Sequence, residues 1–357
     1  MNSILSSVIV RPTADLLIIL ELCFVVSLFF FIPFLCISIG SLILSLWYGR
    51  CGAKDVPGSH EFAREILFKV LPDRHYGFIY GVIPLFTVLV VYAQTLYKAD
   101  IHVVGFFLMA VFCSIVGFHF LYKYRWSIRF RYFLASIEGP LAESKSPVQN
   151  LHGDYAGTNG YTRVLSGGFA LVFLLLAMYQ FLGAMDTVLH PDQWATTKSS
   201  FYFLGSIPFW LRYSFLLSCC FAVTGAAILY FLLKDNNELS EDGYRVAKTC
   251  GANVGLYGTL CVPLFGLFYT WSLPASAYSE SIFCYALYAL ILLFIASARL
   301  ASAAQRSDRR SGSSMAFFLI VIALCFSSVG DNIARENATA SHTQKILTQE
   351  GGSSTEH

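Results

Sequence analysis

The chain has 357 residues, of which 56% are hydrophobic and 13% are charged, and its mean hydropathy is +0.61. Soluble domains carry about 25% charged residues, so this chain lacks about half of the charged surface that a soluble protein has. Its formal net charge of +2 gives no indication of a nucleic-acid partner. The composition therefore predicts an integral membrane protein whose immediate partner is membrane lipid.

Eight stretches are apolar and long enough to cross a bilayer as helices, which takes about 20 residues. They are residues 16–46, 76–97, 102–122, 164–184, 209–233, 251–273, 281–300 and 314–333. The first stretch is far longer than the roughly 7–15 apolar residues of a signal peptide, so we expect it to remain as the first span. The predicted fold class is an all-α integral membrane protein, with a bundle of about eight transmembrane helices over residues 1–333.

Basic residues are concentrated in the loops that follow the first, third, fifth and seventh spans. They are Arg50, Lys54, Arg64, Lys69 and Arg74; Lys123, Arg125, Arg129, Arg131, Lys145 and Arg163; Lys234, Arg245 and Lys248; and Arg299, Arg306, Arg309 and Arg310. With eight spans, all four loops fall on one side, which the positive-inside rule assigns to the cytoplasm. Both termini are then expected outside, in the periplasm, if the protein lies in a bacterial inner membrane.

Residues 59–71 form an amphipathic pattern in the first of these loops. One helical face carries Phe62, Ile66, Leu67, Val70 and Leu71, and the opposite face carries Glu61, Glu65 and Lys69. The pattern predicts a helix in the plane of the membrane, with a helix that binds a partner as the alternative.

Two further segments are expected on the outer side. Residues 187–208 are rich in aromatic side chains and are expected to cover the mouth of the bundle. Residues 334–357 are polar and are expected to form a short helix followed by a disordered periplasmic tail.

Polar side chains at membrane depth are the default candidates for a site, because hydrocarbon penalises them. Glu21, Gln94, His102 and Gln180 lie near the outer ends of the first four spans, where they could line one pocket. A carboxylate and an imidazole can accept the protons that a quinol loses, and an amide can hold the ring oxygen. The predicted catalytic residues are thus Glu21 and His102, and the predicted quinol-binding residues are Gln94 and Gln180. The alternative for each is an interfacial position in contact with water or lipid headgroups.

His75 and His119 lie at the inner ends of the second and third spans and are the candidate axial ligands of a b-type haem. The alternative is an interfacial or hydrogen-bonded role for each. The 10 cysteines form no C-x-x-C-H motif, so no c-type haem is expected, and no metal site is predicted.

Three pieces of the chain resemble the cytochrome bd-like membrane proteins, which are relatives of the quinol-oxidising subunit I. They are Gly81-Val82-Ile83-Pro84-Leu85 with Tyr92-Ala93-Gln94 and Tyr97; Leu211-Arg212-Tyr213 with Ala222-Val223-Thr224-Gly225; and Gly266-Leu267-Phe268 with Leu273-Pro274. The chain departs from the family where histidines would be expected, because Ser214 follows Arg212-Tyr213 and Phe31-Ile32-Pro33 contains none. The resemblance implies a member that has lost some or all of its haem ligands.

The predicted function is a membrane subunit of a respiratory electron-transfer complex that binds quinol near the periplasmic face, with other subunits of the complex as partners. If it is an enzyme, it is part of a quinol-oxidising oxidoreductase. Two other classes stay open. A haem-less scaffold or assembly protein would need no small ligand. A secondary transporter would need a midplane substrate site and related halves, and the sequence shows no internal repeat.

Overall fold

The computed structural model describes residues 14–96, 99, 102–141, 148–194, 196–197, 199–233, 239–305 and 314–352. Within these ranges all regular structure is helical, and no strand occurs. Eight helices are long and apolar enough to cross a membrane, which confirms the predicted all-α, multi-pass fold. Their spans are Asp15–Arg50, Arg74–Thr95, Val103–Phe130, Val164–Leu189, Ile207–Leu232, Glu241–Trp271, Glu280–Gln305 and Met315–Lys345.

The long helices are α2 (Ala14–Asp55), α5 (Ile83–Thr95), α6 (Val103–Leu141), α7 (Val148–Leu189), α8 (Ile207–Ala227), α9 (Glu241–Trp271), α10 (Glu280–Gln305) and α11 (Ser314–Gly352). The shorter ones are α3 (Ser59–Glu65) and α4 (Arg74–Gly77). Single π-helical turns follow α3, α4 and α8, and they cover Ile66–Val70, Phe78–Val82 and Ile228–Leu232. The second span therefore consists of α4, a π-helical turn and α5.

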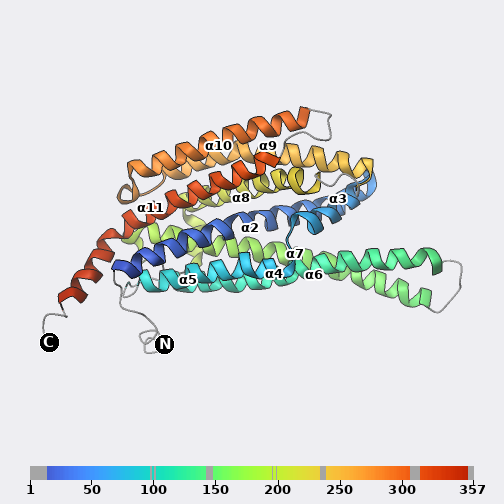
Figure 1. Ribbon diagram of the computed structural model, residues 1–357. Coiled ribbons are helices and arrows are strands. Elements are labelled where there is room, and N and C mark those ends of the chain that lie inside the picture. Colours follow the sequence, from blue (N-terminus) through green and yellow to red (C-terminus); the bar gives the residue numbers. More distant parts are fainter. Residues whose placement is uncertain are drawn as a thin grey trace.

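Helix α2 lies between the two halves of the bundle and packs against α5, α7, α8 and α11 (Figure 1). Helices that follow one another in the chain form pairs: α6 with α7, α8 with α9, and α10 with α11. The half made of α5, α6 and α7 lies on one side of α2, and the half made of α8, α9, α10 and α11 lies on the other (Figure 1). The first turn of α2 and the last turns of α11 lie at the same end of the bundle (Figure 1).

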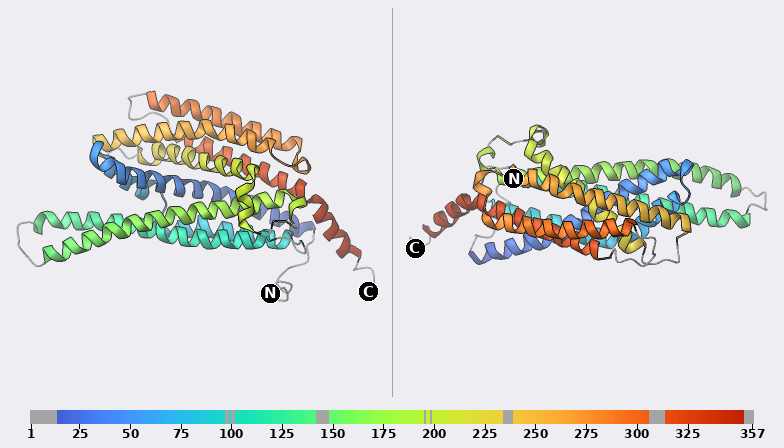
Figure 2. Two further views of the ribbon diagram at one scale, coloured as in Figure 1. Left: turned by 180° about the vertical axis from the view of Figure 1, so that it is seen from behind. Right: turned by 90° about the horizontal axis from the view of Figure 1, so that it is seen from above.

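Helices α6 and α7 extend past the other helices at the opposite end, as both views of Figure 2 show. Helix α6 has 39 residues. At 1.5 Å per residue it is about 58 Å long, nearly twice the roughly 30 Å of a bilayer core. The pair therefore projects beyond the apolar part of the bundle.

Small residues bring α8 and α9 into close contact. A Cβ atom placed on Gly225 of α8 would overlap the backbone of Gly255 on α9, and one placed on Gly258 would overlap the backbone of Ala222. Close approach of backbones through small residues stabilises helix pairs in membranes, where the hydrophobic effect between helices is weak. The small residues therefore determine how α8 and α9 pack.

The predicted amphipathic helix of residues 59–71 is formed by α3 and the π-helical turn Ile66–Val70. All residues of its predicted apolar face are buried. This face contacts α2, α9 and the π-helical turn that follows α8, so the bundle covers it. A helix in the plane of the membrane would instead turn its apolar face toward lipid. On the other face, Glu61 accepts a 3.0 Å hydrogen bond from the backbone nitrogen of Ser240 and so caps the start of α9. Glu65, expected on the polar face, is buried and paired with Arg64 at 2.6 Å.

The segment 334–352 differs from its prediction, because it continues α11 without a break instead of forming a short helix and a disordered tail. Residues 353–357 lie outside the described residues. Ala334 and Ala338 are buried, and Asn337 donates a 3.1 Å hydrogen bond to the backbone oxygen of Ala277. One face of the polar segment is thus docked against neighbouring loops, which its composition alone did not indicate.

Candidate functional site

Buried polar side chains gather at the end of the bundle where α2 begins. We call them the end cluster, and they are Asp186 of α7, Arg212 of α8, Tyr269 of α9, and Asp331, Asn332 and Arg335 of α11. All are buried except Asp331, whose side chain is 20% exposed. Ionisable groups within spans are expensive, so they pair with one another or take part in function.

An ion pair between Arg212 and Asp331 forms the centre of the end cluster. The Nη2 group of Arg212 donates to Oδ2 of Asp331 at 2.8 Å, and the hydroxyl of Tyr269 donates to Oδ1 at 3.1 Å. The guanidinium carbon of Arg212 also lies 5.1 Å from the centre of the Tyr269 ring, within the range of a cation–π contact. The carboxyl group of Asp186 is buried within electrostatic range of Arg212. The hydrogen bonds of the Asp331 carboxylate therefore join α11 to α8 and α9.

Arg335 follows Asp331 by four residues and thus lies on the same face of α11. Its Nη2 group donates to Oδ1 of Asn332 at 2.7 Å, and its guanidinium carbon lies 4.4 Å from the centre of the Phe24 ring on α2. A carboxylate oxygen of Glu336 lies 3.8 Å from Nη2 of Arg335. The predicted acceptor Glu21 is half-buried near the start of α2 and lies within electrostatic range of Glu336.

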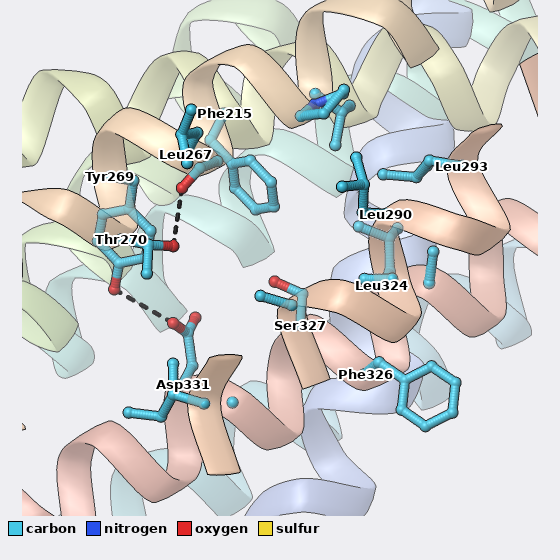
Figure 3. A pocket seen from close by; sticks show the side chains of 18 of the residues that line it. Phe215, Leu267, Tyr269, Thr270, Leu290, Leu293, Leu324, Phe326, Ser327 and Asp331 are labelled. Carbon is cyan, nitrogen blue, oxygen red and sulfur yellow. Dashed lines mark hydrogen bonds between the residues drawn. The ribbon is translucent and has the colours of Figure 1, made fainter. Parts of the chain in front are cut away.

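An apolar pocket with a volume of about 280 Å³ lies between α8, α9, α10 and α11, beside the end cluster (Figure 3). Its volume is close to the lower limit of the about 300–1,000 Å³ that is usual for small-molecule sites. One wall is polar and is formed by Tyr269, Thr270, Ser327 and Asp331. In Figure 3 the carboxylate of Asp331 meets the hydroxyl of Tyr269 at one end of the pocket, and the hydroxyl of Ser327 points toward the enclosed space.

The mouth of the pocket is apolar. Its residues include four large hydrophobic side chains that are exposed on the bundle surface: Leu267, Phe283, Leu287 and Leu290. Pro263 interrupts the hydrogen bonding of α9 on another wall, because proline has no N–H to donate to the carbonyl four residues earlier. An apolar mouth of this kind is chemically suited to lipid-soluble molecules.

The predicted quinol residues do not line this pocket. Gln180 is buried, and its Oε1 accepts a 2.9 Å hydrogen bond from the hydroxyl of Ser200, so it holds the segment 187–208 in place. The Oε1 atom of Gln94 is buried and has no hydrogen-bond partner among the described residues. His102 is exposed, and its backbone oxygen accepts from two amides in the first turn of α6.

The segment 187–208 covers the end of the bundle, as expected. Phe203 is buried, and its ring centre lies 5.2 Å from that of Phe106 on α6. The ring of Trp194 lies 5.4 Å from that of His342 on α11. The segment therefore connects α6 with the end of α11.

The candidate haem ligands are both exposed side chains. His75 lies in α4, and His119 lies in α6 with its ring centre 5.6 Å from that of its neighbour Phe120. A b-type haem in a helix bundle needs ligands that face the interior, so these two residues do not fit such a haem. The described residues contain no group of three or more His, Cys, Asp or Glu side chains that could hold a metal ion.

Sequence reasoning missed the Arg212–Asp331 pair. From the sequence, Arg212 was named only as part of the motif Leu211-Arg212-Tyr213, and Asp331 was not singled out. Both positions fall inside the predicted spans 209–233 and 314–333, so the rule that flags ionisable residues at membrane depth applied to them as well.

In comparisons with protein-family models, curated protein sequences and solved structures, no match to this chain was found.

Proposed function

We propose that the protein is a membrane subunit of an electron-transfer assembly and that it binds a quinol-class molecule in the pocket between α8, α9, α10 and α11. The observation that carries the proposal is the combination of an apolar mouth with a polar wall that contains a carboxylate. A quinol combines an apolar tail with ring hydroxyls, so it matches both parts. Its redox partner would lie in another subunit, because His75 and His119 do not fit a haem.

The polar wall is able to accept hydrogen bonds from ring hydroxyls. Each oxygen of Asp331 accepts one hydrogen bond from the protein and keeps further lone pairs. The hydroxyl of Thr270 donates to the backbone oxygen of Gly266 at 2.8 Å, so its own oxygen is also an acceptor. The proposal thus assigns to Asp331 the role that the sequence suggested for Glu21 and His102, and to Thr270 the role suggested for Gln94 and Gln180.

The position of the pocket along the bundle supports a site near the outer face. The residues of its polar wall lie toward the end of the bundle at which α2 begins. Figure 1 shows that the last turns of α11 lie at the same end. The distribution of basic loops assigns this end to the outside, or to the periplasm in a bacterial host.

A side chain that fills the pocket tests the proposal. Ala286 lines the pocket but is exposed, so Ala286→Phe is expected to occupy the space without disturbing the buried core. Ala298→Phe on the same helix is the matched control, because Ala298 is exposed and does not line the pocket. We expect the wild type and the control, both in lipid nanodiscs, to bind a fluorescent short-chain benzoquinol, and Ala286→Phe to lose this binding.

Equal binding by the wild type and by Ala286→Phe would reject the site. If none of the three proteins binds the quinol and the wild type retains only phospholipid, the pocket is a lipid-filled groove. That result would reject the proposed function and favour the scaffold alternative.

A further inference from the structure

A second cavity, with a volume of about 20 Å³, lies on the other side of Asp331. It is enclosed by residues of α2, α7, α8 and α11. Its polar lining is formed by Arg212, Ser327, Ser328 and Asp331, and the rest is apolar. A cavity needs about 10–15 Å³ to hold one water molecule, together with two to four polar partners. The size of this cavity therefore matches a single water.

Arg212 has a donor that needs a partner at this place. Its side chain is 3% exposed, and its Nη1 atom is buried with no hydrogen-bond partner among the described residues. A buried donor of a charged group is costly to leave unsatisfied, so such donors are normally paired with protein or with ordered water. The Nη2 atom is already bound to Asp331, and the cavity is the space that remains beside the same side chain.

The cavity also offers acceptors. The hydroxyl of Ser328 donates to the backbone oxygen of Leu324 at 2.9 Å, so its oxygen is able to accept a hydrogen bond. The carboxylate of Asp331 keeps lone pairs beyond the two that bind Arg212 and Tyr269. One donor and two acceptors around a space of this size suit a water molecule, which donates twice and accepts twice. A monatomic anion would lie beside the carboxylate of Asp331, so it is disfavoured.

We infer that this cavity is a built site for one water molecule, bound between the guanidinium of Arg212 and the carboxylate of Asp331. Asp331 and Ser327 line both this cavity and the larger pocket, so the water lies directly behind the polar wall of that pocket. When an apolar molecule fills the pocket and excludes other water, this bound water keeps the ion pair solvated. The inference concerns the empty protein as well, so it does not require that the ligand of the pocket be a quinol.

The experiment is a cryo-electron microscopy map of the protein in lipid nanodiscs, at a resolution that shows ordered water, without added ligand. We expect a density peak within hydrogen-bond distance of Nη1 of Arg212.

A Leu216→Phe variant complements the map, since Leu216 lines the small cavity but not the larger pocket. We expect loss of the peak in this variant. An empty cavity in the wild type, in a map with ordered water elsewhere in the bundle, would overturn the inference. A second sample would be prepared in a buffer that contains bromide. Bromide in place of the water peak would also overturn the inference, because an anion would then occupy the site. Failure of quinol binding by the wild type, with the peak present, would reject the proposed function alone.

Discussion

The two halves of the bundle on either side of α2 are packed by different means. In the half that contains α5, α6 and α7, large aromatic rings meet. Tyr92 of α5 stacks on Phe107 of α6 with ring centres 4.7 Å apart, and Phe181 of α7 contacts Phe31 of α2 with ring centres 5.1 Å apart. In the other half, α8 and α9 meet through glycines. In α10, only 22% of the most apolar 18-residue stretch is buried inside the protein. Aromatic rings fill space in the first half, whereas close backbone contact and a loosely covered helix leave a pocket in the second. The candidate site thus lies in the half where two backbones meet closely and one helix is loosely covered.

The largest effect is expected from separating the ion pair that closes the pocket. Asp331→Leu removes the carboxylate that is hydrogen-bonded to the buried guanidinium of Arg212, and breaking a buried ion pair in this way costs about 3–5 kcal/mol. The measurement is the free energy of unfolding in mixed micelles. The double variant Arg212→Leu/Asp331→Leu removes both charges and is expected to recover most of the loss. Equal loss in the single and double variants would mean that the pair does not act as a unit.

A smaller effect is expected when the close contact of α8 and α9 is blocked. Gly225→Ala places a methyl group against the backbone of Gly255, and overpacking of this kind costs about 1–3 kcal/mol. Gly168→Ala on α7 is the matched control in the other half, because a Cβ atom there would meet nothing within 4 Å. Comparable unfolding free energies for the two variants would contradict the proposed difference between the halves.

The smallest effect is expected from the hydroxyl of Tyr269. Tyr269→Phe removes its hydrogen bond to Asp331 but keeps the ring beneath Arg212, so a loss of about 1 kcal/mol is expected. Tyr257→Phe on the same helix serves as the control, because Tyr257 is exposed. Thermal unfolding of both variants in detergent distinguishes them. A wild-type melting temperature for Tyr269→Phe would show that this hydroxyl does not stabilise the carboxylate.

Much of the architecture could be predicted from local composition. Each span is recognisable from its own run of apolar residues. The pattern of residues 59–71 correctly predicted a buried apolar face for that helix, although Glu65 of its polar face is buried as well. The tail was harder, because polar residues at 334–352 look like solvent-exposed chain. Their burial depends on loops that are distant in sequence, such as the one that contains Ala277.

The candidate site was less predictable. Glu21 and Gln94 were singled out by their depth, which is a local property, and depth alone does not say which way a side chain points. His119 has the depth of a ligand but is exposed on the outside of α6. Arg212 lies inside a predicted span, but no local feature of the sequence identifies Asp331 as its partner.

The sequence by itself determined that this is a membrane protein and how many spans it has, because the transfer of a helix into lipid depends on the residues of that helix alone. Only the tertiary structure decided which of the scarce polar side chains meet. Arg212 and Asp331 are 119 positions apart, and their contact depends on the packing of α8 against α11. The pocket likewise exists only where four helices fail to fill the space between them, and the sequence of one helix does not specify such a gap.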